Sequence, residues 1–380
     1  MFAAASALST LFVSHYDGHV FTLNLNASGG HLIQSNSLQA CGSMPSWLTY
    51  DAATAMLYCV DESGSSANSG NGTLSSFVVD TRNKGSSALT KEATTETLPG
   101  GVASVIYEGD CHRRYLAIAH YEGSAVSTFQ LPLTPRSTAL QTFEYVLTEP
   151  ATDPSRQDAP HPHEVFLDPT GAYVLAPDLG MDIIHIYAID KATGKLHECS
   201  QFKVKGGNGP RHGAWTTGSN SEKSAILYIS NELANTVGIY TATYSEGCLA
   251  LRDAGEVTPY PKDVPNTATI AEIRIVGGKD IYVSVRNDQA FPPNDSIAFL
   301  ETSRTDDATY KTLTSSYGKT PRTCVINKAG TLLAIGNQAS SDVAIVERDP
   351  KSGALGKLVA QLQVGNPGLS NGLSSVVWAE

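Results

Sequence analysis

A repeated pattern of short strands constrains the fold more than any other feature of this 380-residue sequence. Each copy has an apolar strand ending in a polar residue, a loop, and a second apolar strand. Seven copies occur, at 11–32, 57–80, 115–131, 173–196, 227–249, 281–300 and 332–355. Their spacing of roughly 45 to 60 residues is typical of four-stranded propeller blades. We therefore predict an all-β fold, a seven-bladed β-propeller of four-stranded antiparallel blades.

The two ends of the sequence fit the same ring. ALSTLFVS (7–14) and LSSVVWA (373–379) both read as apolar strands and are expected to pair within one blade. Such closure leaves no exposed strand edges. The Gly/Ser/Asn-rich stretch 62–73 is expected to be a loop inside the second blade. Because no linker divides the chain, residues 1–380 are expected to form a single propeller domain.

Composition excludes several classes of partner. With a net charge of −11 and no basic block, the chain is not expected to bind nucleic acid. No apolar run is long enough to span a membrane. A small anionic substrate would need local Arg or His groups to offset the negative field. The sequence does not indicate an oligomeric state.

The cysteines and the N-terminus bear on metal sites and location. The six cysteines are scattered without a CxxC pair, so zinc is not expected and disulfides are left open. Met1 to Val13 lacks a basic start, so no signal peptide is expected. We expect a cytoplasmic protein, with secretion left open.

The stretch 160–180, PHPHEVFLDPTGAYVLAPDLG, is the first place to look for chemistry. HEVFL (163–167) and AYVLA (172–176) read as two strands around an Asp-Pro-Thr-Gly turn. Antiparallel pairing brings His161 and His163, at the start of the hairpin, to the same edge as Asp178 at its end. His161 is expected to support the connection rather than face His163.

Equivalent positions in the other copies carry polar side chains. The innermost strand starts beside proline at Pro162-His163, Pro210-Arg211 and Pro321-Arg322. The end of the next strand contributes Tyr16, Glu62, His120, Asp178, Glu232, Arg286 and Asn337. The hairpin geometry places both sets on one face of the ring. We therefore predict that five of these side chains converge at the axis: His163, Arg211, Glu232, Arg286 and Arg322.

Each of these residues also has a purely structural interpretation. Polar groups at strand ends often cap turns, as loop-stabilising bonds would explain Asp178, and His120 fits packing at the rim. Glu232 with Arg211 fits a plain salt bridge. Three guanidinium groups, a carboxylate and an imidazole together are better explained by an anion site, because clustered like charges cost stability unless an anion lies between them.

Several ordered motifs carry a family resemblance. They include PHPHEVFLDPTG, DLGMDIIHIY, GNGPRHGAW, LYISNELANTVGIY and PRTCVINKAGTLLAIGNQ. The chain resembles the lactonase family of seven-bladed β-propellers, which includes the bacterial-type 6-phosphogluconolactonases and the fungal carboxymuconate lactonizing enzymes. The resemblance covers most of the chain and is strongest from about residue 160 to 350. It implies catalytic roles for His163, Arg211, Glu232 and Arg286.

The expected function is metal-free hydrolysis, or reversible formation, of a lactone of a small sugar acid or carboxylic acid. His163, with an unperturbed pKa of about 6.5, would accept and return the proton near neutral pH. Arg286 and Arg211 would hold the carboxylate and stabilise developing charge, and Glu232 would orient His163 or act as a second base. Substrate binding is further assigned to Arg322, His120, Asp178, Asn337 and Trp47. No metal and no cofactor are expected.

Two alternatives stay open. The same groups suit a cycloisomerase of the carboxymuconate lactonizing type, which adds a proton to carbon. A propeller can also be a non-catalytic binding scaffold, because a fold does not establish a function.

Overall fold

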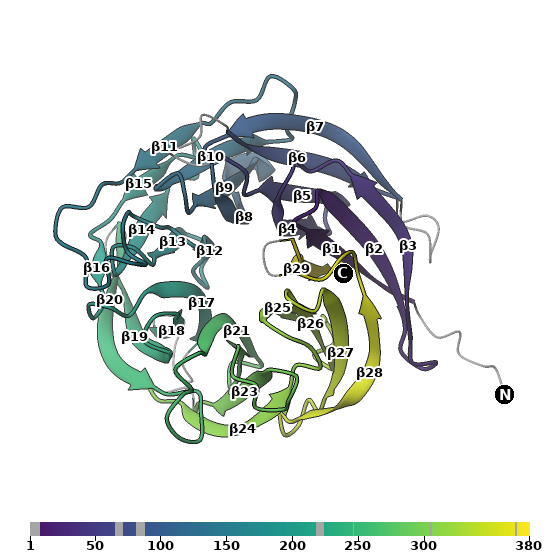
Figure 1. The fold of residues 1–380 in the computed structure, drawn as a ribbon. Helices are drawn as coiled ribbons and strands as arrows, with labels where there is room; N and C mark the ends of the chain where they lie inside the picture. The colour runs from purple at the N-terminus through teal and green to yellow at the C-terminus, as the bar shows by residue number, and fades with distance from the viewer. Residues whose placement is uncertain are drawn as a thin grey trace.

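The computed structural model is a ring of seven β-sheets around a central axis (Figure 1). It describes residues 8–64, 71–80, 88–217, 224–245, 247–303, 306–368 and 371–380. The predicted fold class is therefore confirmed. Two expectations fall largely outside the described residues: the core of the 62–73 loop, at 65–70, and the first seven residues of the N-terminal segment. That residues 1–380 form one domain stays a prediction.

We number the sheets as blades 1 to 7 and list their strands from the axis outward. Blade 1 has β4 (Pro45–Asp51), β5 (Met56–Asp61), β6 (Gly72–Val79) and β7 (Leu89–Thr97). Blade 2 has β8 (Gly101–Glu108), β9 (Arg114–His120), β10 (Ala125–Leu131) and β11 (Gln141–Glu144). Blade 3 has β12 (Phe166–Leu167), β13 (Tyr173–Asp178), β14 (Ile183–Ile189) and β15 (Leu196–Glu198), and β16 (Phe202–Lys203) also pairs with β14.

The remaining four blades complete the ring. Blade 4 has β17 (Pro210–Thr217), β18 (Ser224–Asn231), β19 (Thr236–Ser245) and β20 (Cys248–Val257). Blade 5 has β21 (Thr269–Val276), β22 (Asp280–Arg286), β23 (Ser296–Glu301) and β24 (Thr309–Ser315). Blade 6 has β25 (Pro321–Ile326), β26 (Leu332–Asn337), β27 (Asp342–Arg348) and β28 (Leu355–Gln363). Blade 7 has β29 (Leu373–Trp378), β1 (Ser9–His15), β2 (His19–Asn26) and β3 (His31–Gln39).

Blade 7 closes the ring, as predicted. The last strand, β29, is innermost and pairs antiparallel with the first, with Leu11 opposite Trp378 and Val13 opposite Val376. The core lies between neighbouring blades: Val13 and Phe21 of blade 7 belong to one buried cluster with Val343 of blade 6. Each sheet buries one face against each neighbouring blade, and the side chains of a strand alternate between these two faces, which explains why the strands are apolar on both.

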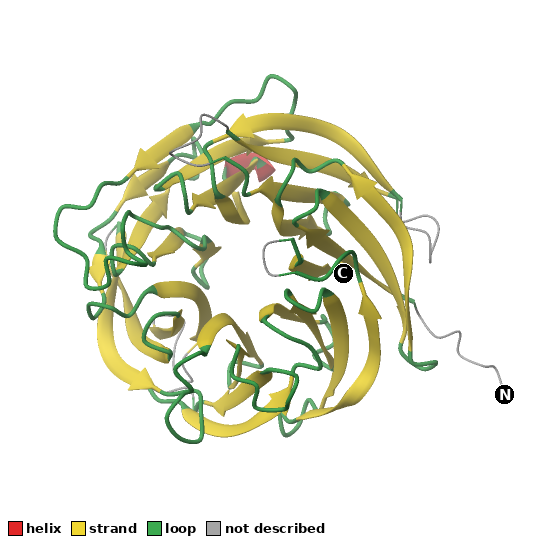
Figure 2. Cartoon of the chain, in the orientation of Figure 1, coloured by secondary structure: helices red, strands yellow, loops and turns green. Residues whose placement is uncertain are grey.

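Helix is almost absent from the described part of the chain. Only one short 3-10 turn, Asp110–His112, interrupts the strands and loops (Figure 2). No helix among the described residues is long and apolar enough to cross a membrane.

Every blade has an irregularity at the start of its innermost strand. The pairing register shifts by one residue between Pro45 and Trp47 in blade 1, and equivalent shifts occur in blades 2, 4, 5, 6 and 7. In blade 3, the isolated bridge of Pro162 to Asp178 and the pair of Phe166 with Leu175 leave one extra residue between them. These are β-bulges, which re-aim side chains and increase local twist. The predicted strand 163–167 is therefore shorter, at Phe166–Leu167.

Four of the six cysteines form disulfides. Cys41–Cys59 joins the loop before β4 to β5, and Cys199–Cys248 joins blade 3 to blade 4. Cys111 is exposed and free, and Cys324 is buried and free. The sequence left this pairing open because spacing alone does not show which cysteines meet.

Candidate active site

Charged side chains converge on a small pocket at one end of the channel. The pocket has a volume of about 170 Å³ and is lined by Glu62, Val102, Tyr121, Arg156, His163, Arg211, Glu232, Arg286 and Arg322. The structure thus brings together the five side chains that the sequence placed at the axis. A larger hollow of about 680 Å³, around Leu233 and Val264, contains only Lys262 and Asp263 as charged lining groups. Titratable groups therefore concentrate in the smaller pocket.

The bulges deliver part of the pocket wall. Arg211 is the extra residue between Pro210 and His212 in blade 4, and Arg322 occupies the same position after Pro321 in blade 6. Val102 is the extra residue in blade 2. A bulge turns an additional side chain to the axis that a regular strand would point into the blade. The same backbone feature therefore supplies three of the lining groups.

The second strands of blades 1, 2, 4 and 5 supply four more lining residues, at one register position. Glu62 and Glu232 follow Asp61 and Asn231, which are the residues paired with the prolines before the bulges. Arg286 likewise follows Val285, which pairs with Ile270 immediately before the bulge of blade 5. In blade 2 the equivalent residue is Tyr121, one after His120, and it lines the pocket.

Three residues assigned to substrate binding lie one residue before the register position whose side chain faces the pocket. His120, Asp178 and Asn337 pair with the residue before the bulge, so their side chains turn into the blade and are completely buried. A hydrogen bond of 2.7 Å joins His120 Nε2 to Ser127 Oγ. The pocket lining contains none of the three.

Internal hydrogen bonds occupy the two other residues of this set. Asp178 accepts the backbone N–H groups of His161 and Met181 at 2.8 and 2.9 Å. Asn337 donates to the Ser316 carbonyl at 3.0 Å. These are the turn-stabilising contacts of the structural interpretation, which the positions of the three residues favour over substrate binding.

Trp47 lies against His212 and outside the pocket lining. It follows the bulge of blade 1, is partly buried, and packs its ring 5.6 Å from the ring of His212 at 66°. It is not among the residues that line the pocket. Contact with His212, rather than with substrate, is the role that its position supports.

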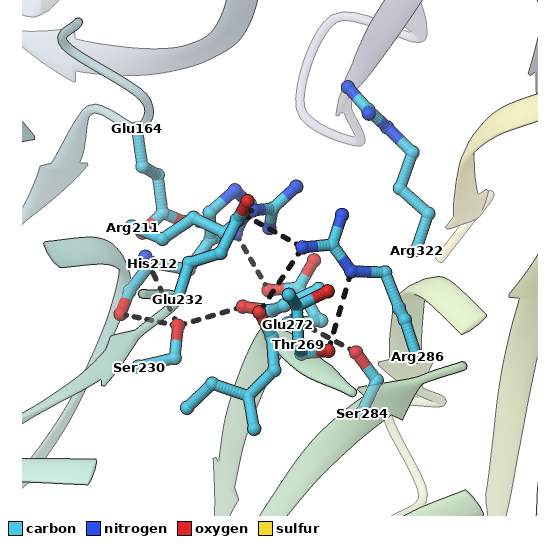
Figure 3. Close-up of polar contacts among 12 residues, drawn as sticks. Glu164, Arg211, His212, Ser230, Glu232, Thr269, Glu272, Ser284, Arg286 and Arg322 are labelled. Atoms are coloured by element: carbon cyan, nitrogen blue, oxygen red, sulfur yellow. Dashed lines mark hydrogen bonds and ion pairs between the residues drawn. The ribbon is translucent and has the colours of Figure 1, made fainter. Parts of the chain in front are cut away.

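Glu232 is the centre of the charged pocket (Figure 3). Its carboxylate lies 2.6 Å from Arg156 Nη2, 2.8 Å from Arg211 Nε and 2.9 Å from Arg286 Nη2. Burial alone would raise the pKa of Glu232, but Arg286 and Arg211, then Arg156, lower it to about 2. Glu232 is therefore a charged anchor for three guanidinium groups. The expectation that it orients His163 or acts as a base does not fit these contacts.

The arginines differ in how firmly they are held. Arg211 is 1% exposed, and burial followed by the neighbouring Arg286 lowers its pKa to about 10. Its Nη1 has no hydrogen-bond partner among the described residues. Arg286 also reaches the Thr269 and Ile270 carbonyls at 3.5 and 3.4 Å. Each guanidinium thus keeps donor capacity beyond its pairing with Glu232.

Arg322 belongs to a separate pair on the opposite wall. Its Nη2 lies 3.5 Å from Glu62 Oε2, and its guanidinium lies 5.4 Å from the centre of the Tyr16 ring. The Tyr16 hydroxyl donates to the same Glu62 carboxylate. The pocket thus has two carboxylates and four guanidinium groups, a formal charge of +2 in a chain of charge −11.

His163 is neutral in this environment. Burial first, and then Arg211, His212 and Arg322, lower its pKa well below the usual value. Its Nδ1 is buried without a partner among the described residues, and the side chain lines the pocket. The folded environment therefore holds the pKa of His163 below the unperturbed value of about 6.5 from which the sequence argument started. A neutral imidazole is the form that can accept a proton.

The connection before His163 contributes a residue that the sequence did not single out. Arg156 lies in the loop between β11 and β12, and its side chain is 40% exposed. The next residue, Gln157, fixes this loop by donating to the Leu179 carbonyl at 2.9 Å and to Asp182 at 2.8 Å. His161 adds a stacked ring contact of 4.0 Å with Tyr121. These contacts, as expected for His161, support the connection.

A second polar group, which the sequence did not predict, lies beside the pocket (Figure 3). Glu164, His212 and Glu272 are buried and hold potential ligand atoms within 4.8 Å of one another. However, His212 Nδ1 is 3.0 Å from Glu272 Oε1, and Arg274 lies 3.4 Å from the same oxygen. A divalent ion would have to displace that contact beside a guanidinium. The group therefore does not fit a metal site, and the expected absence of metal stays a prediction.

Comparison with known proteins assigns the chain to a family. Residues 10–377 match the family described as "Lactonase, 7-bladed beta-propeller". The chain belongs to this family of propeller lactonases. The predicted resemblance and the expected enzyme class, a lactonase, are thereby confirmed.

Named relatives of this lactonase span most of its length. It is 29% identical over 314 residues to a "Probable 6-phosphogluconolactonase" of Arthroderma benhamiae, covering 82% of this chain and 75% of that protein. It is 24% identical over 326 residues to the 6-phosphogluconolactonase of Bacillus subtilis, covering 85% of each. These relatives fit the main expectation of an enzyme that acts on a lactone.

Solved structures agree on the fold. The periplasmic gluconolactonase of Pseudomonas aeruginosa has a TM-score of 0.80 to this lactonase at 21% identity, covering 98% of this chain and 99% of that one. At this identity, the likeness shows the fold alone.

Proposed function

We propose that this lactonase hydrolyses the lactone of an anionic sugar acid in the pocket between Arg211 and Arg322. One observation carries the proposal: four guanidinium groups and one neutral imidazole face the same space of about 170 Å³. Guanidinium groups bind carboxylate or phosphate through paired N–H donors. The formal charge of +2 favours a ligand with a doubly negative group, such as a phosphorylated sugar acid.

His163 is the base in this proposal. Its Nε2 takes a proton from a water molecule while the water oxygen attacks the lactone carbonyl carbon. The carbonyl oxygen becomes an oxyanion, which Arg211 or Arg286 stabilises with preorganised N–H donors. The ring C–O bond then breaks, and the leaving oxygen takes the proton back from His163. The products are the open acid and its free hydroxyl, and His163 returns to its neutral form.

A substrate panel tests the proposal. Wild-type enzyme is assayed by base consumption on 6-phosphogluconolactone, on unphosphorylated gluconolactone and on a muconolactone. We expect kcat/KM for the phosphorylated lactone to exceed that for the neutral one by roughly 10- to 100-fold, the value of one or two charge-assisted hydrogen bonds. Turnover of the muconolactone alone would favour the cycloisomerase alternative. Turnover of none would favour the binding scaffold.

Metal independence is part of the same proposal. Prolonged chelation is expected to leave activity unchanged, because Arg274 and the His212–Glu272 contact occupy the one group of potential ligands found among the described residues. Loss of activity with EDTA and recovery with a single divalent ion would contradict this model of the site.

The expected cytoplasmic location stays a prediction, and two features of the chain bear on it. The disulfides Cys41–Cys59 and Cys199–Cys248 count against it, because disulfides persist mainly in oxidising compartments. Fractionation of the native host, followed by thiol labelling of the protein before and after reduction, tests both the location and the pairing.

A further inference from the structure

Two buried side chains that do not line the pocket, His212 and Glu272, follow His163 in a row. His212 directly follows the bulge residue Arg211, and its ring lies 5.1 Å from the His163 ring at 62°. On its other side, His212 Nδ1 lies 3.0 Å from Glu272 Oε1. Glu272, His212 and His163 therefore form a continuous series from blade 5 through blade 4 to blade 3, and Figure 3 shows its first two members together.

Glu272 is a fixed negative charge at the end of this series. It is 0% exposed, and its backbone N–H donates to Ser284 Oγ at 2.9 Å. Burial would raise the pKa of Glu272, but Arg274 and His212 outweigh it and lower the pKa to about 2. A carboxylate only accepts hydrogen bonds. The proton of the 3.0 Å contact therefore belongs to His212 Nδ1, and His212 Nε2 carries a lone pair.

Two buried ring nitrogens are left without partners. His212 Nε2 and His163 Nδ1 both lack a hydrogen-bond partner among the described residues. They are complementary, because a base at His163 Nε2 requires the proton on Nδ1, and His212 Nε2 can only accept. Hydrogen bonds between catalytic groups are often long in ligand-free structures and tighten when substrate binds.

We propose that Glu272 and His212 form a positioning pair for His163. His212 accepts the Nδ1 proton of His163 and thereby leaves His163 Nε2 free to act as the base. When His163 takes up a proton, the carboxylate of Glu272 stabilises the imidazolium through His212, as a carboxylate does for the histidine of a catalytic triad. The inference rests on the proposed function, since it assumes that His163 is the base.

The charges around His163 make such support necessary. Tyr121, Arg211, His212 and Arg322 face its ring directly or from neighbouring walls, and Glu62, Arg156, Glu232 and Arg286 lie across the pocket. The arginines oppose a positive charge on His163, and the two pocket carboxylates are already paired with them. On the His212 side, the charged groups are Glu272 and Arg274, because Glu164 holds a proton.

The proton on Glu164 provides a matched control. Burial and the charge of Glu272 raise the pKa of Glu164. Its Oε2 accepts the Gly213 N–H at 2.6 Å, a contact that glutamine can keep. Glu164→Gln and Glu272→Gln are therefore the same substitution in the same buried group. Only Glu272→Gln removes a negative charge.

The test compares these two variants. Glu272→Gln is expected to lower kcat by roughly 10- to 100-fold with KM within a few-fold, the usual effect of removing an orienting partner. It should also lower the pKa of His163 by about one unit in an NMR titration. Glu164→Gln should leave both quantities unchanged at pH 7. Equal effects of the two variants on kcat and on the His163 pKa would overturn the positioning pair.

The NMR measurement separates this inference from the proposed function. Nitrogen-15 spectra of the ligand-free wild-type protein report the tautomers of both rings without any substrate or variant. We expect His212 to be protonated at Nδ1 and His163 at Nδ1. A His163 ring protonated at Nε2 would overturn the inference even if lactone is hydrolysed. The expected tautomers without lactone turnover would leave the pair intact and refute the proposed function.

Discussion

The two halves of the ring share one backbone feature and use it differently. In blades 3 to 6 the bulge segments carry His163 and Glu164, then Arg211, Glu272 and Arg322. In blades 7, 1 and 2 the same segments carry Ser374, Ser46 and Val102. The bulge is therefore a property of the propeller, and the charged half is a property of this sequence. The backbone register places a bulge segment at the axis in all seven blades, and in blades 3 to 6 this segment carries a charged or imidazole side chain.

The uncharged half uses its bulges to join neighbouring blades. Ser46 Oγ in blade 1 donates to the Gly101 carbonyl of blade 2 at 2.5 Å, and Ser374 Oγ in blade 7 donates to the Pro45 carbonyl of blade 1 at 2.5 Å. Each acceptor is the residue before the next bulge. The comparison predicts that removing a charged side chain or the His163 ring from the charged half changes catalysis, whereas substitutions in the uncharged half change stability.

The largest effect is expected for His163→Ala. If His163 is the base, kcat should fall by roughly 10²- to 10⁴-fold while KM stays within a few-fold. The melting temperature should change little, because Nδ1 of the ring has no hydrogen-bond partner among the described residues and the ring lines the pocket. Steady-state kinetics and thermal unfolding are measured together. Wild-type turnover with a lowered melting temperature would make His163 a structural residue and end the contrast between the halves.

Arg286→Ala tests the anion clamp and should have the next largest effect. Arg286 pairs with Glu232 at 2.9 Å and retains donors for a ligand. Its loss is expected to raise KM by roughly 10- to 100-fold, as for one or two charge-assisted hydrogen bonds. Arg286→Lys should recover little, because an ammonium lacks the planar two-donor geometry. Full recovery in Arg286→Lys would indicate a simple point charge rather than a clamp.

These positions could be predicted from the sequence to the extent that a local signal marks the bulge. Proline precedes Arg211, Arg322 and His163, and this local signal marks all three as residues at the axis. Gly101 precedes Val102, and Ala271 precedes Glu272, so the bulges of blades 2 and 5 carried no such signal. A regular strand alternates its side chains, whereas a bulge turns successive residues to the axis.

The other site residues that the sequence does not indicate depend on the pairing register of strands or on the tertiary contacts of loops. The sequence indicates His120 rather than Tyr121, because the end of a strand is visible in a sequence and its pairing register is not. Regular alternation along the strand gives no sign that His212, next to Arg211, also lies near the site. Arg156 has no periodic context, and tertiary bonds from Gln157 to Leu179 and Asp182 position its loop. The repeated strand pattern predicts the fold, but it does not predict the row of His212 and Glu272 next to His163.

The buried carboxyl group of Glu164 should make the free energy of unfolding depend on pH. Burial and Glu272 raise the pKa of Glu164 to about 8, above an unfolded value of about 4.5. Between these values the folded state holds a proton that the unfolded state has lost. This group therefore makes unfolding easier as pH rises, by up to about 1.4 kcal/mol per pH unit.

Glu164→Gln measures the contribution of Glu164 to the pH dependence of the free energy of unfolding. The variant should remove that part of the slope of unfolding free energy between about pH 4.5 and pH 8, as read from denaturant midpoints at several pH values. Glu149→Gln is a suitable control, because Glu149 is exposed and, within the described part of the chain, forms an ion pair with Lys203 alone. An unchanged slope in Glu164→Gln would mean that Glu164 is ionised at neutral pH.

The smallest effect is expected for Ser46→Ala in the uncharged half. Ser46 is fully buried, and its hydroxyl bonds the Gly101 carbonyl at 2.5 Å and the Val60 carbonyl at 3.1 Å. Removing the hydroxyl leaves two buried carbonyl groups with one donor fewer, which costs about 1 kcal/mol of stability. Ser46 lies outside the pocket lining, so kcat and KM should stay within about two-fold. Ser374→Ala, at the same bulge position one blade earlier, should behave alike. Denaturant unfolding and kinetics on the same preparations test both. A tenfold loss of kcat without loss of stability would show that the serine bulges contribute to catalysis, and the division of the ring into a chemical and a structural half would then be wrong.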